Sequence, residues 1–185
     1  MGFPTDKYTS GLDKVYTSIL KGYANRPITL LEIGVYEGGS MLFFEDMLPQ
    51  ATIYGIDILD RPACLSESKV LTSVIDQNDT AGLENLATLA GGFDVIIDDG
   101  SHFTKETKNS FDTLWKHVKN GGIYVIEDWV IGVKTRYSEN IAYSEATREM
   151  GNLVLDIASK HKELGITSFK MVVEETWQSY AIFKK

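Results

Sequence analysis

The sequence predicts an α/β fold built on an open, doubly wound sheet that is mostly parallel, with one antiparallel strand near its edge. Apolar runs of strand length alternate with helix-like segments, as in parallel sheets whose two faces are covered by helices. Near the C-terminus this alternation stops, because residues 174–179 are the only connection between two strand-like runs. A parallel pair needs a crossover of about a dozen residues or more, so these runs predict an antiparallel pair.

The strands are expected where Val, Ile and Leu form continuous runs, as in Leu30-Leu-Glu-Ile33 and Asp94-Val-Ile-Ile97. In chain order they cover residues 28–33, 52–58, 69–75, 93–97, 123–126, 169–173 and 180–183. Helices are expected at residues 12–23, 40–48, 80–90, 105–119 and 141–164. The last helix has the clearest pattern, because apolar residues recur at helical spacing from Met150 to Ala158 and Gly165 follows as a stop signal.

Length and composition favour a single domain that spans residues 1–185, since no Pro/Ser-rich or single-sign stretch offers a linker. The net charge of -8 and the scattered lysines argue against a nucleic-acid partner. The single cysteine, Cys64, has no partner for a disulfide or a metal site, which fits a reducing compartment. No apolar stretch approaches the roughly 18 to 20 residues of a membrane span, and residues 1–7 do not resemble an export signal. We therefore expect a soluble cytoplasmic protein with no membrane partner.

Acidic residues follow two of the expected strands. The two runs are Phe93-Asp-Val-Ile-Ile-Asp-Asp-Gly-Ser-His102 and Gly121-Gly-Ile-Tyr-Val-Ile-Glu-Asp128. If both strands end at one edge of the sheet, four carboxylates gather there: Asp98, Asp99, Glu127 and Asp128. Such a cluster requires a cation. Neighbouring side chains on a strand point to opposite faces, so we expect one of Asp98 and Asp99 to be structural.

A glycine-rich turn follows the first expected strand, in Glu32-Ile-Gly-Val-Tyr-Glu-Gly-Gly-Ser40. Gly34 allows a tight turn, and Gly38-Gly39 allow the backbone to approach a ligand before a helix begins. The spacing differs from the Gly-x-Gly-x-x-Gly of dinucleotide sites and from phosphate-binding loops. After the second strand, Asp57 stands where a carboxylate can accept hydrogen bonds from a ribose. Such turns also occur without a ligand, and Asp57 could simply cap the next segment.

Polar residues at successive strand ends favour a ligand site over a chance turn. Glu32 and the glycines follow the first strand, Asp57 follows the second, and Asp76-Gln-Asn78 follow the third. Open α/β sheets bind their ligands at the carboxyl ends of the strands. We therefore expect a ligand that carries a ribose to lie across this edge.

The motifs that carry a family resemblance are Leu31-Glu-Ile-Gly-Val-Tyr-Glu-Gly-Gly-Ser40, Ile53-Tyr-Gly-Ile-Asp57 and Asp76-Gln-Asn-Asp79. In them the chain resembles the S-adenosylmethionine-dependent methyltransferases of the Rossmann-like seven-strand class, whose reversed strand near the sheet edge matches the predicted antiparallel pair. The further motifs are Ile97-Asp-Asp-Gly-Ser-His102, Tyr124-Val-Ile-Glu-Asp128 and the start Thr5-Asp-Lys7 followed by Tyr16. They are similar to the macrocin and mycinamicin sugar O-methyltransferases of macrolide biosynthesis. The likeness covers about residues 5–128.

The resemblance implies a role for each matching residue. Those that would line the S-adenosylmethionine site are Glu32, Gly34, Ser40, Asp57, Asp76 and Gln77. Asp57 would bind the ribose, and Asp76 and Gln77 would lie near the adenine. The residues implied as magnesium ligands are Asp99, Glu127 and Asp128, and His102 is implied as the general base, so that Asp99 and His102 would be catalytic.

The implied reaction moves a methyl group from S-adenosylmethionine to a hydroxyl of a small molecule, with a sugar of a macrolide-like natural product as the family's suggestion. A hydroxyl is a poor nucleophile until its proton is shared or removed. A hard divalent cation held by carboxylate oxygens lowers the pKa of a bound hydroxyl, and the imidazole of His102 could then take the proton. His117 and His161 fall in expected helices, and we expect both to be solvated.

Several alternatives stay open in the sequence. Trp129 either lines the acceptor pocket or packs against the core, and Ser101 could cap the helix expected from Lys105. Residues 130–140 are short for an acceptor-binding insertion, which leaves the acceptor open. Another hydroxylated molecule, such as a glycan or a polyphenol, would satisfy the same metal geometry, and a homo-oligomer could close the pocket. Two other functions are a module that binds S-adenosylmethionine without turnover and a nucleotide-sugar or nicotinamide enzyme on a similar sheet, which the loop spacing disfavours.

Overall fold

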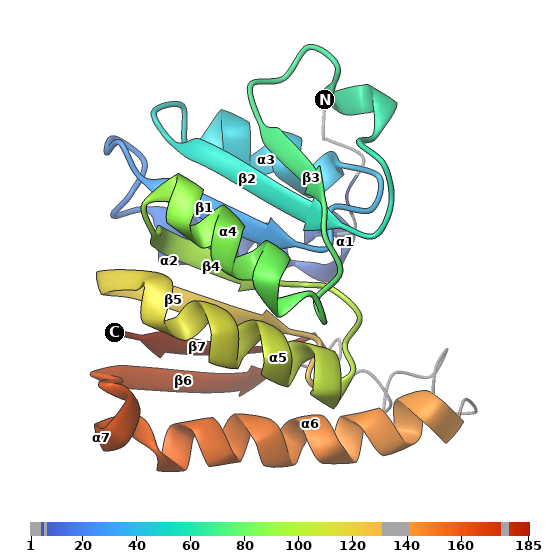
Figure 1. Cartoon of the computed structure of the whole chain (residues 1–185), viewed down its shortest axis with the longest axis vertical. Helices are drawn as coiled ribbons and strands as arrows, with labels where there is room; N and C mark the ends of the chain where they lie inside the picture. The colour runs from blue at the N-terminus through green and yellow to red at the C-terminus, as the bar shows by residue number, and fades with distance from the viewer. Residues whose placement is uncertain (1–4, 6, 131–140, 175–177) are drawn as a thin grey trace.

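The computed structural model describes residues 5, 7–130, 141–174 and 178–185, and it describes residues 141–148 by their backbone only. Within these residues, seven strands form one sheet in the order β3-β2-β1-β4-β5-β7-β6 (Figure 1). The strands are β1 (Thr29–Ile33), β2 (Thr52–Asp57), β3 (Leu71–Val74), β4 (Phe93–Asp98), β5 (Val118–Glu127), β6 (Ser168–Val173) and β7 (Ser179–Lys184). The first five pair in parallel, and β7 runs antiparallel to both β5 and β6. The predicted fold, with its reversed strand near one edge, is therefore confirmed.

The helices are α1 (Lys7–Ser10), α2 (Leu12–Leu20), α3 (Gly39–Met47), α4 (Thr80–Ala90), α5 (Thr104–Leu114), α6 (Ile141–Ser159) and α7 (His161–Leu164), with short 3-10 turns η1 (Ala63–Leu65) and η2 (Trp115–His117). Three expected helices are too long, and the one expected over 12–23 ends at Leu20. The helix expected over 105–119 ends at Leu114 and passes into the 3-10 turn η2, after which Val118 takes an extended backbone. The helix expected over 141–164 is interrupted at Lys160, and its predicted stop at Gly165 is confirmed by a left-handed φ of 68°.

Helices cover both faces of the sheet, with α4 and α5 in front of it in Figure 1 and α2 and α3 behind. One core cluster joins the inner faces of α4, α5 and α6 to residues such as Leu31 and Tyr124 of the sheet. The second joins α2 and α3 to the alternate residues, such as Leu30 and Val125. Successive strand residues thus pack in different layers, as the pleat requires. Each fully buried Leu contributes about 1.5 to 3 kcal/mol relative to exposure.

The register aligns the carboxyl ends of the central strands at one edge. Ile33 pairs with Ile56 of β2 on one side and with Asp98 of β4 on the other, and Asp98 pairs with Ile126 of β5. The strand order reverses between β1 and β4, the point at which open α/β sheets form a ligand-binding crevice. None of the described helices is both long and apolar enough to span a membrane.

Candidate functional site

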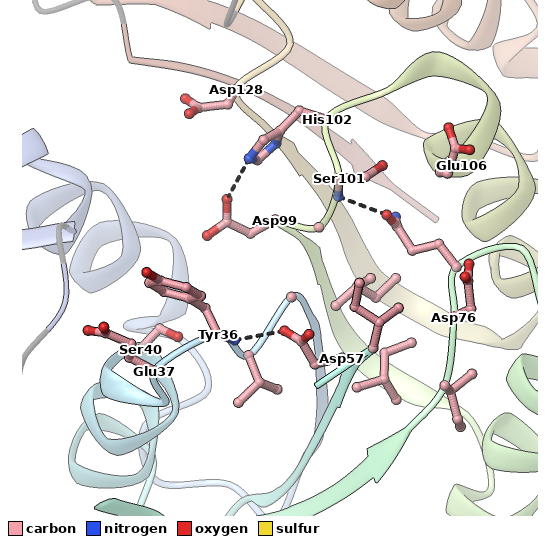
Figure 2. A pocket seen from close by; sticks show the side chains of 18 of the residues that line it. Tyr36, Glu37, Ser40, Asp57, Asp76, Asp99, Ser101, His102, Glu106 and Asp128 are labelled. Atoms are coloured by element: carbon pink, nitrogen blue, oxygen red, sulfur yellow. Dashed lines mark hydrogen bonds and ion pairs between the residues drawn. The ribbon is translucent and has the colours of Figure 1, made fainter. Parts of the chain in front are cut away.

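A cavity of about 920 Å³ opens at this edge of the sheet, between the glycine-rich loop after β1 and the loops after β2, β3, β4 and β5. Among the described residues, the non-glycine positions with positive φ are Tyr36 at 46°, His102 at 60° and Asp128 at 54°, and all of them line this cavity. Such backbone conformations are costly and gather at functional sites. Figure 2 shows Tyr36 and Asp57 on one side of the cavity and Asp99, His102 and Asp128 on the other.

Gly34 holds the glycine loop against the end of β4. Its φ is +92°, and a Cβ at this position would lie 2.2 Å from the carbonyl oxygen of Asp99. Its N–H donates to the carbonyl of Ile56, while the N–H of Asp99 donates to the carbonyl of Ile33. Only glycine fits this approach, so the loop and Asp99 keep a fixed relation to one another.

Asp57 is oriented by two backbone donors. Its Oδ2 accepts from the N–H of Tyr36 at 2.8 Å, and its Oδ1 accepts from the N–H of Leu59 at 2.9 Å. The carboxylate therefore does fasten the two loops, and it also lines the cavity. Each carboxylate oxygen has a second acceptor position, so the local bonds leave capacity for ribose hydroxyls.

Asp76 and Gln77 lie at the next strand end but differ in their surroundings. Asp76 lines the cavity and accepts from the N–H of Asn78 at 2.7 Å. Gln77 is buried, and its amide nitrogen donates to Asp98 at 2.9 Å and to Ser110 at 3.0 Å. Its amide oxygen accepts from the N–H of Ser101 at 2.8 Å. The Gln77 side chain thus ties the loop after β3 to the loop after β4.

Glu32 lies behind the wall of the cavity. It is fully buried, and its Oε2 accepts from the hydroxyl of Ser40 at 2.7 Å, whereas Ser40 itself lines the cavity. Burial raises the pKa of Glu32 to about 8, although Lys7 and Ser40 oppose this shift. Its Oε1 is buried without a hydrogen-bond partner, and it lies 3.8 Å from the ammonium nitrogen of Lys7.

Asp98 serves the core. It is 2 % exposed, and it accepts from the phenol of Tyr124 at 2.9 Å as well as from Gln77. Burial raises its pKa to about 7, and the hydrogen bonds from Tyr124 and Gln77 counteract part of this rise. The prediction that one residue of the Asp98-Asp99 pair is structural agrees with this environment.

Lys7 is a buried cation that sequence reasoning did not single out. Its side chain is 1 % exposed, and Nζ lies 2.9 Å from Oδ2 of Asp99 and 2.8 Å from Oε1 of Glu127. Burial lowers the pKa of a lysine, but the charges of Asp99, Glu127 and Glu32 outweigh burial and hold the pKa of Lys7 well above its usual range. The only signal in the sequence was the family-like start that contains Lys7, which carried no assigned role.

Tyr16 adds a second donor to the same cluster. Its hydroxyl donates to Oε1 of Glu127 at 2.5 Å, and its ring centroid lies 5.5 Å from Nζ of Lys7. Burial and the charge of Asp99 raise the pKa of Glu127 to about 7, against the effects of Lys7 and Tyr16. Glu127 is therefore held from the α2 side of the sheet by two buried side chains.

The residues expected to bind magnesium suit a hard cation in their chemistry. Asp99, Glu127 and Asp128 supply carboxylate oxygens from the ends of adjacent strands, and oxygen is the donor that Mg²⁺ prefers. The partly exposed carboxylate of Asp99 and the buried carboxylate of Glu127 already share the positive charge of Lys7. In the part of the chain that the structure describes, no three His, Cys, Asp or Glu side chains converge as a preformed metal cluster. The donor atoms suit Mg²⁺, and in the structure Lys7 neutralises the charges of Asp99 and Glu127.

His102 faces the same end of the cavity. Its Nε2 lies 3.9 Å from Oδ1 of Asp99, and its side chain is 18 % exposed. The other two histidines are engaged elsewhere: His117 contacts Glu84 at 2.7 Å, and His161 contacts the carbonyl of Ala158 at 3.1 Å. Both are partly exposed, so the expectation that they are solvated holds only in part.

The structure distinguishes between the alternatives left open for two neighbouring residues. Ser101 does not cap α5, because the residue at the cap position is Phe103 and the Ser101 hydroxyl accepts from the N–H of Phe103 at 3.3 Å. Trp129 is not among the residues that line the cavity, since its ring packs against the core cluster beneath α6. The expected acceptor segment 130–140 lies outside the described residues, apart from Val130.

Comparison with known proteins places these motifs in a wider context. The chain is 39% identical over 120 residues to the mycinamicin VI 2''-O-methyltransferase of Micromonospora griseorubida, an alignment that covers 61% of this chain and 30% of the relative. It is 39% identical over 120 residues to the demethylmacrocin O-methyltransferase of Streptomyces fradiae, with the same coverage. The chain thus spans about a third of the length of these curated relatives.

Solved structures agree with this likeness. The MycE methyltransferase from the mycinamycin pathway, solved with Mg and SAH, superposes with a TM-score of 0.74 at 28% identity and covers 93% of this chain and 48% of MycE. A caffeoyl-CoA O-methyltransferase homologue from Staphylococcus aureus shares the fold at 14% identity, with a TM-score of 0.67 over 99% of this chain and 86% of its own. A family profile described as a methyltransferase domain matches residues 31–129, more than half of the chain. The chain therefore belongs to this methyltransferase-domain family.

Proposed function

We propose that the chain transfers a methyl group from S-adenosylmethionine to a hydroxyl of a small molecule, with a hard divalent cation such as Mg²⁺ at the acceptor. The observation that carries this proposal is the single cavity that joins the glycine loop and Asp57 to Asp99, His102 and Asp128. A methyl donor and an acceptor must share one space for in-line displacement. The relatives named above, with their sugar substrates, support the same reaction class.

The cofactor would occupy the half of the cavity beside the glycine loop. Gly34 and Ser40 form that wall, Asp57 would accept hydrogen bonds from the ribose, and Asp76 would lie at the adenine. Gln77 would lie at the edge of the adenine, while its side-chain amide forms hydrogen bonds with Asp98 and Ser101. Glu32 lies behind the cavity wall and would act through Ser40, because it accepts a hydrogen bond from the Ser40 hydroxyl.

The reaction forms a bond between the acceptor oxygen and the methyl carbon while the bond from that carbon to sulfur breaks. The electron pair of the broken bond stays on sulfur and gives S-adenosylhomocysteine, and the hydroxyl proton passes to a ring nitrogen of His102. When bound, a cation held by Asp99, Glu127 and Asp128 would make the hydroxyl more acidic. General-base help of this kind is typically worth about a hundredfold or more.

The acceptor we propose is a hydroxylated small molecule, with a glycoside of a macrolide-like product as the first compound to test. The cavity is lined by the carboxylates of Glu37, Asp57, Asp76, Asp99, Glu106 and Asp128. Lys7 is the only lysine or arginine among the described lining residues. A neutral hydroxyl compound fits this acidic surface better than a phosphorylated one.

Calorimetric titration of S-adenosylhomocysteine tests the cofactor site, with and without Mg²⁺. We expect wild type to bind and Asp57→Ala to bind at least tenfold more weakly, because the ribose loses its acceptor. Asp57→Asn, which keeps an oxygen for one of the two backbone donors, separates loss of charge from loss of loop structure. Asp60→Ala is the matched control, since Asp60 lines a different, smaller cavity. A wild type that binds no S-adenosylhomocysteine under any condition contradicts the proposal.

Turnover tests the reaction itself. A screen of hydroxylated acceptors should yield S-adenosylhomocysteine, and Asp99→Ala should abolish its formation while cofactor binding persists. A chain that binds the cofactor but never turns over is a binding module. Tight binding of NADH in place of S-adenosylhomocysteine would instead indicate a nicotinamide enzyme.

A further inference from the structure

Lys7 makes contacts that join three distant parts of the chain. Its ammonium group donates to Asp99 after β4 and to Glu127 at the end of β5, and it lies near Glu32 of β1. It is 1 % exposed, although a lysine is rarely buried without a specific partner. A lysine that only anchored α1 would not need to lie between carboxylates from three strands.

The oxygens used by Lys7 suggest its role. It donates to Oδ2 of Asp99, whereas Oδ1 of the same carboxylate lies on the side of His102, at 3.9 Å from Nε2. Lys7 and Tyr16 both donate to Oε1 of Glu127, so neither of them uses Oε2. One oxygen of each carboxylate is thus held by a buried donor, and the other is not taken by these donors.

Without Lys7, the buried carboxylates of Glu127 and Glu32 and the partly exposed carboxylate of Asp99 would have no cation between them. Like charges repel one another, and the repulsion is strongest for the groups that burial keeps from water, here Glu127 and Glu32. The two side chains would then turn apart, and a cation would have to bring them together again. Groups that orient metal ligands in this way do so by hydrogen bonds to the ligands.

We propose that Lys7 is a positioning residue that holds Asp99 and Glu127 as a pair of cation ligands. This inference rests on the proposed function, because it concerns the cation site of that reaction. Lys7 acts through the two carboxylates and does not contact the reacting atoms. The opposite role, in which Lys7 competes with the cation for the same oxygens, predicts that its removal makes cation binding tighter.

Manganese binding to the full chain separates these roles, with free Mn²⁺ measured by its electron paramagnetic resonance signal. Lys7→Met should weaken Mn²⁺ binding about 10- to 100-fold, the range typical when an orienting partner of metal ligands is removed. Lys119→Met is the matched control, because Lys119 pairs with Asp94 at 2.9 Å at the opposite end of β4. It should bind Mn²⁺ like wild type. Affinity for S-adenosylhomocysteine without metal should be the same in all three proteins.

Each outcome decides the matter. Mn²⁺ binding by Lys7→Met as tight as wild type, or tighter, overturns the role of Lys7 and leaves the proposed reaction standing. Wild type that binds S-adenosylhomocysteine but no Mn²⁺ overturns the cation site and this inference with it. If circular dichroism shows that Lys7→Met does not fold, Lys7→Gln decides, because it keeps a donor and loses the charge. Weaker Mn²⁺ binding by Lys7→Gln supports the proposal, and unchanged binding overturns it.

Discussion

Asp98 and Asp99 are consecutive residues whose carboxylates serve opposite faces of the sheet. Asp98 accepts from Tyr124 and Gln77 on the side covered by α5, whereas Asp99 accepts from Lys7, which lies beside Tyr16 of α2. Alternation along the strand produces this division. One carboxylate therefore organises the core, and the other is delivered to the cavity.

Asp98→Asn should remove a pH dependence of stability. The folded protein holds the Asp98 proton more tightly than the unfolded chain, because the pKa rises from 3.8 to about 7 on burial. The stability contributed by this group is greatest below the unfolded pKa and is lost as pH rises towards 7, with a slope of up to about 1.4 kcal/mol per pH unit. Asparagine does not titrate. Urea unfolding from pH 4 to 8 should give a difference between wild type and Asp98→Asn that falls with pH.

Tyr124→Phe provides the companion measurement for this prediction. The Tyr124 hydroxyl lowers the pKa of Asp98 through its hydrogen bond, so its removal should move the loss of stability to higher pH. Parallel stability curves for wild type and Asp98→Asn over the whole range would show that Asp98 is not the titrating group.

Local patterns predicted most of the fold and the neighbourhood of the site. Strand ends are visible in sequence as apolar runs that stop at polar residues, which brought Asp57, Asp76 and Asp99 to one edge. Pair contacts across the sheet are not visible in the same way. Lys7 is separated by 92 residues from Asp99 and by 120 from Glu127, and no spacing rule connects them. The hydrogen bonds of the Gln77 side chain depend on the course of the loop after β4, and the sequence pattern did not predict them either.

Gly34→Ala should destabilise the protein and disturb the cavity. The new methyl group would meet the carbonyl oxygen of Asp99 at 2.2 Å, a backbone atom that cannot move aside without shifting β4. We expect a loss of more than about 2 kcal/mol, since clash is added to the cost of a positive φ. Gly91→Ala is the control, because Gly91 has a φ of +68° with nothing within 4 Å of the added carbon. Equal losses in the two variants would mean that the approach to Asp99 is not what requires glycine.

Trp129→Phe should leave acceptor kinetics unchanged. The indole packs against the core, and its N–H is buried without a hydrogen-bond partner among the described residues. Phenylalanine keeps an aromatic ring and removes that unsatisfied donor, so the free energy of unfolding should change by less than about 1 kcal/mol. Thermal unfolding measures the stability change, and KM for the acceptor measures the effect on acceptor kinetics. A several-fold rise in KM with unchanged stability would instead place Trp129 at the acceptor.

His102→Asn should slow methyl transfer strongly while the cofactor still binds. Asparagine tolerates the left-handed backbone that His102 adopts at φ 60° better than alanine, so the loop should keep its course. Loss of the base should slow single-turnover formation of S-adenosylhomocysteine about a hundredfold or more. His117→Asn, which removes a contact with Glu84 outside the cavity, should react at the wild-type rate. If His102→Asn matches that rate as well, the proton leaves the acceptor by another route, and the 3.9 Å approach of His102 to Asp99 serves only to order the loop.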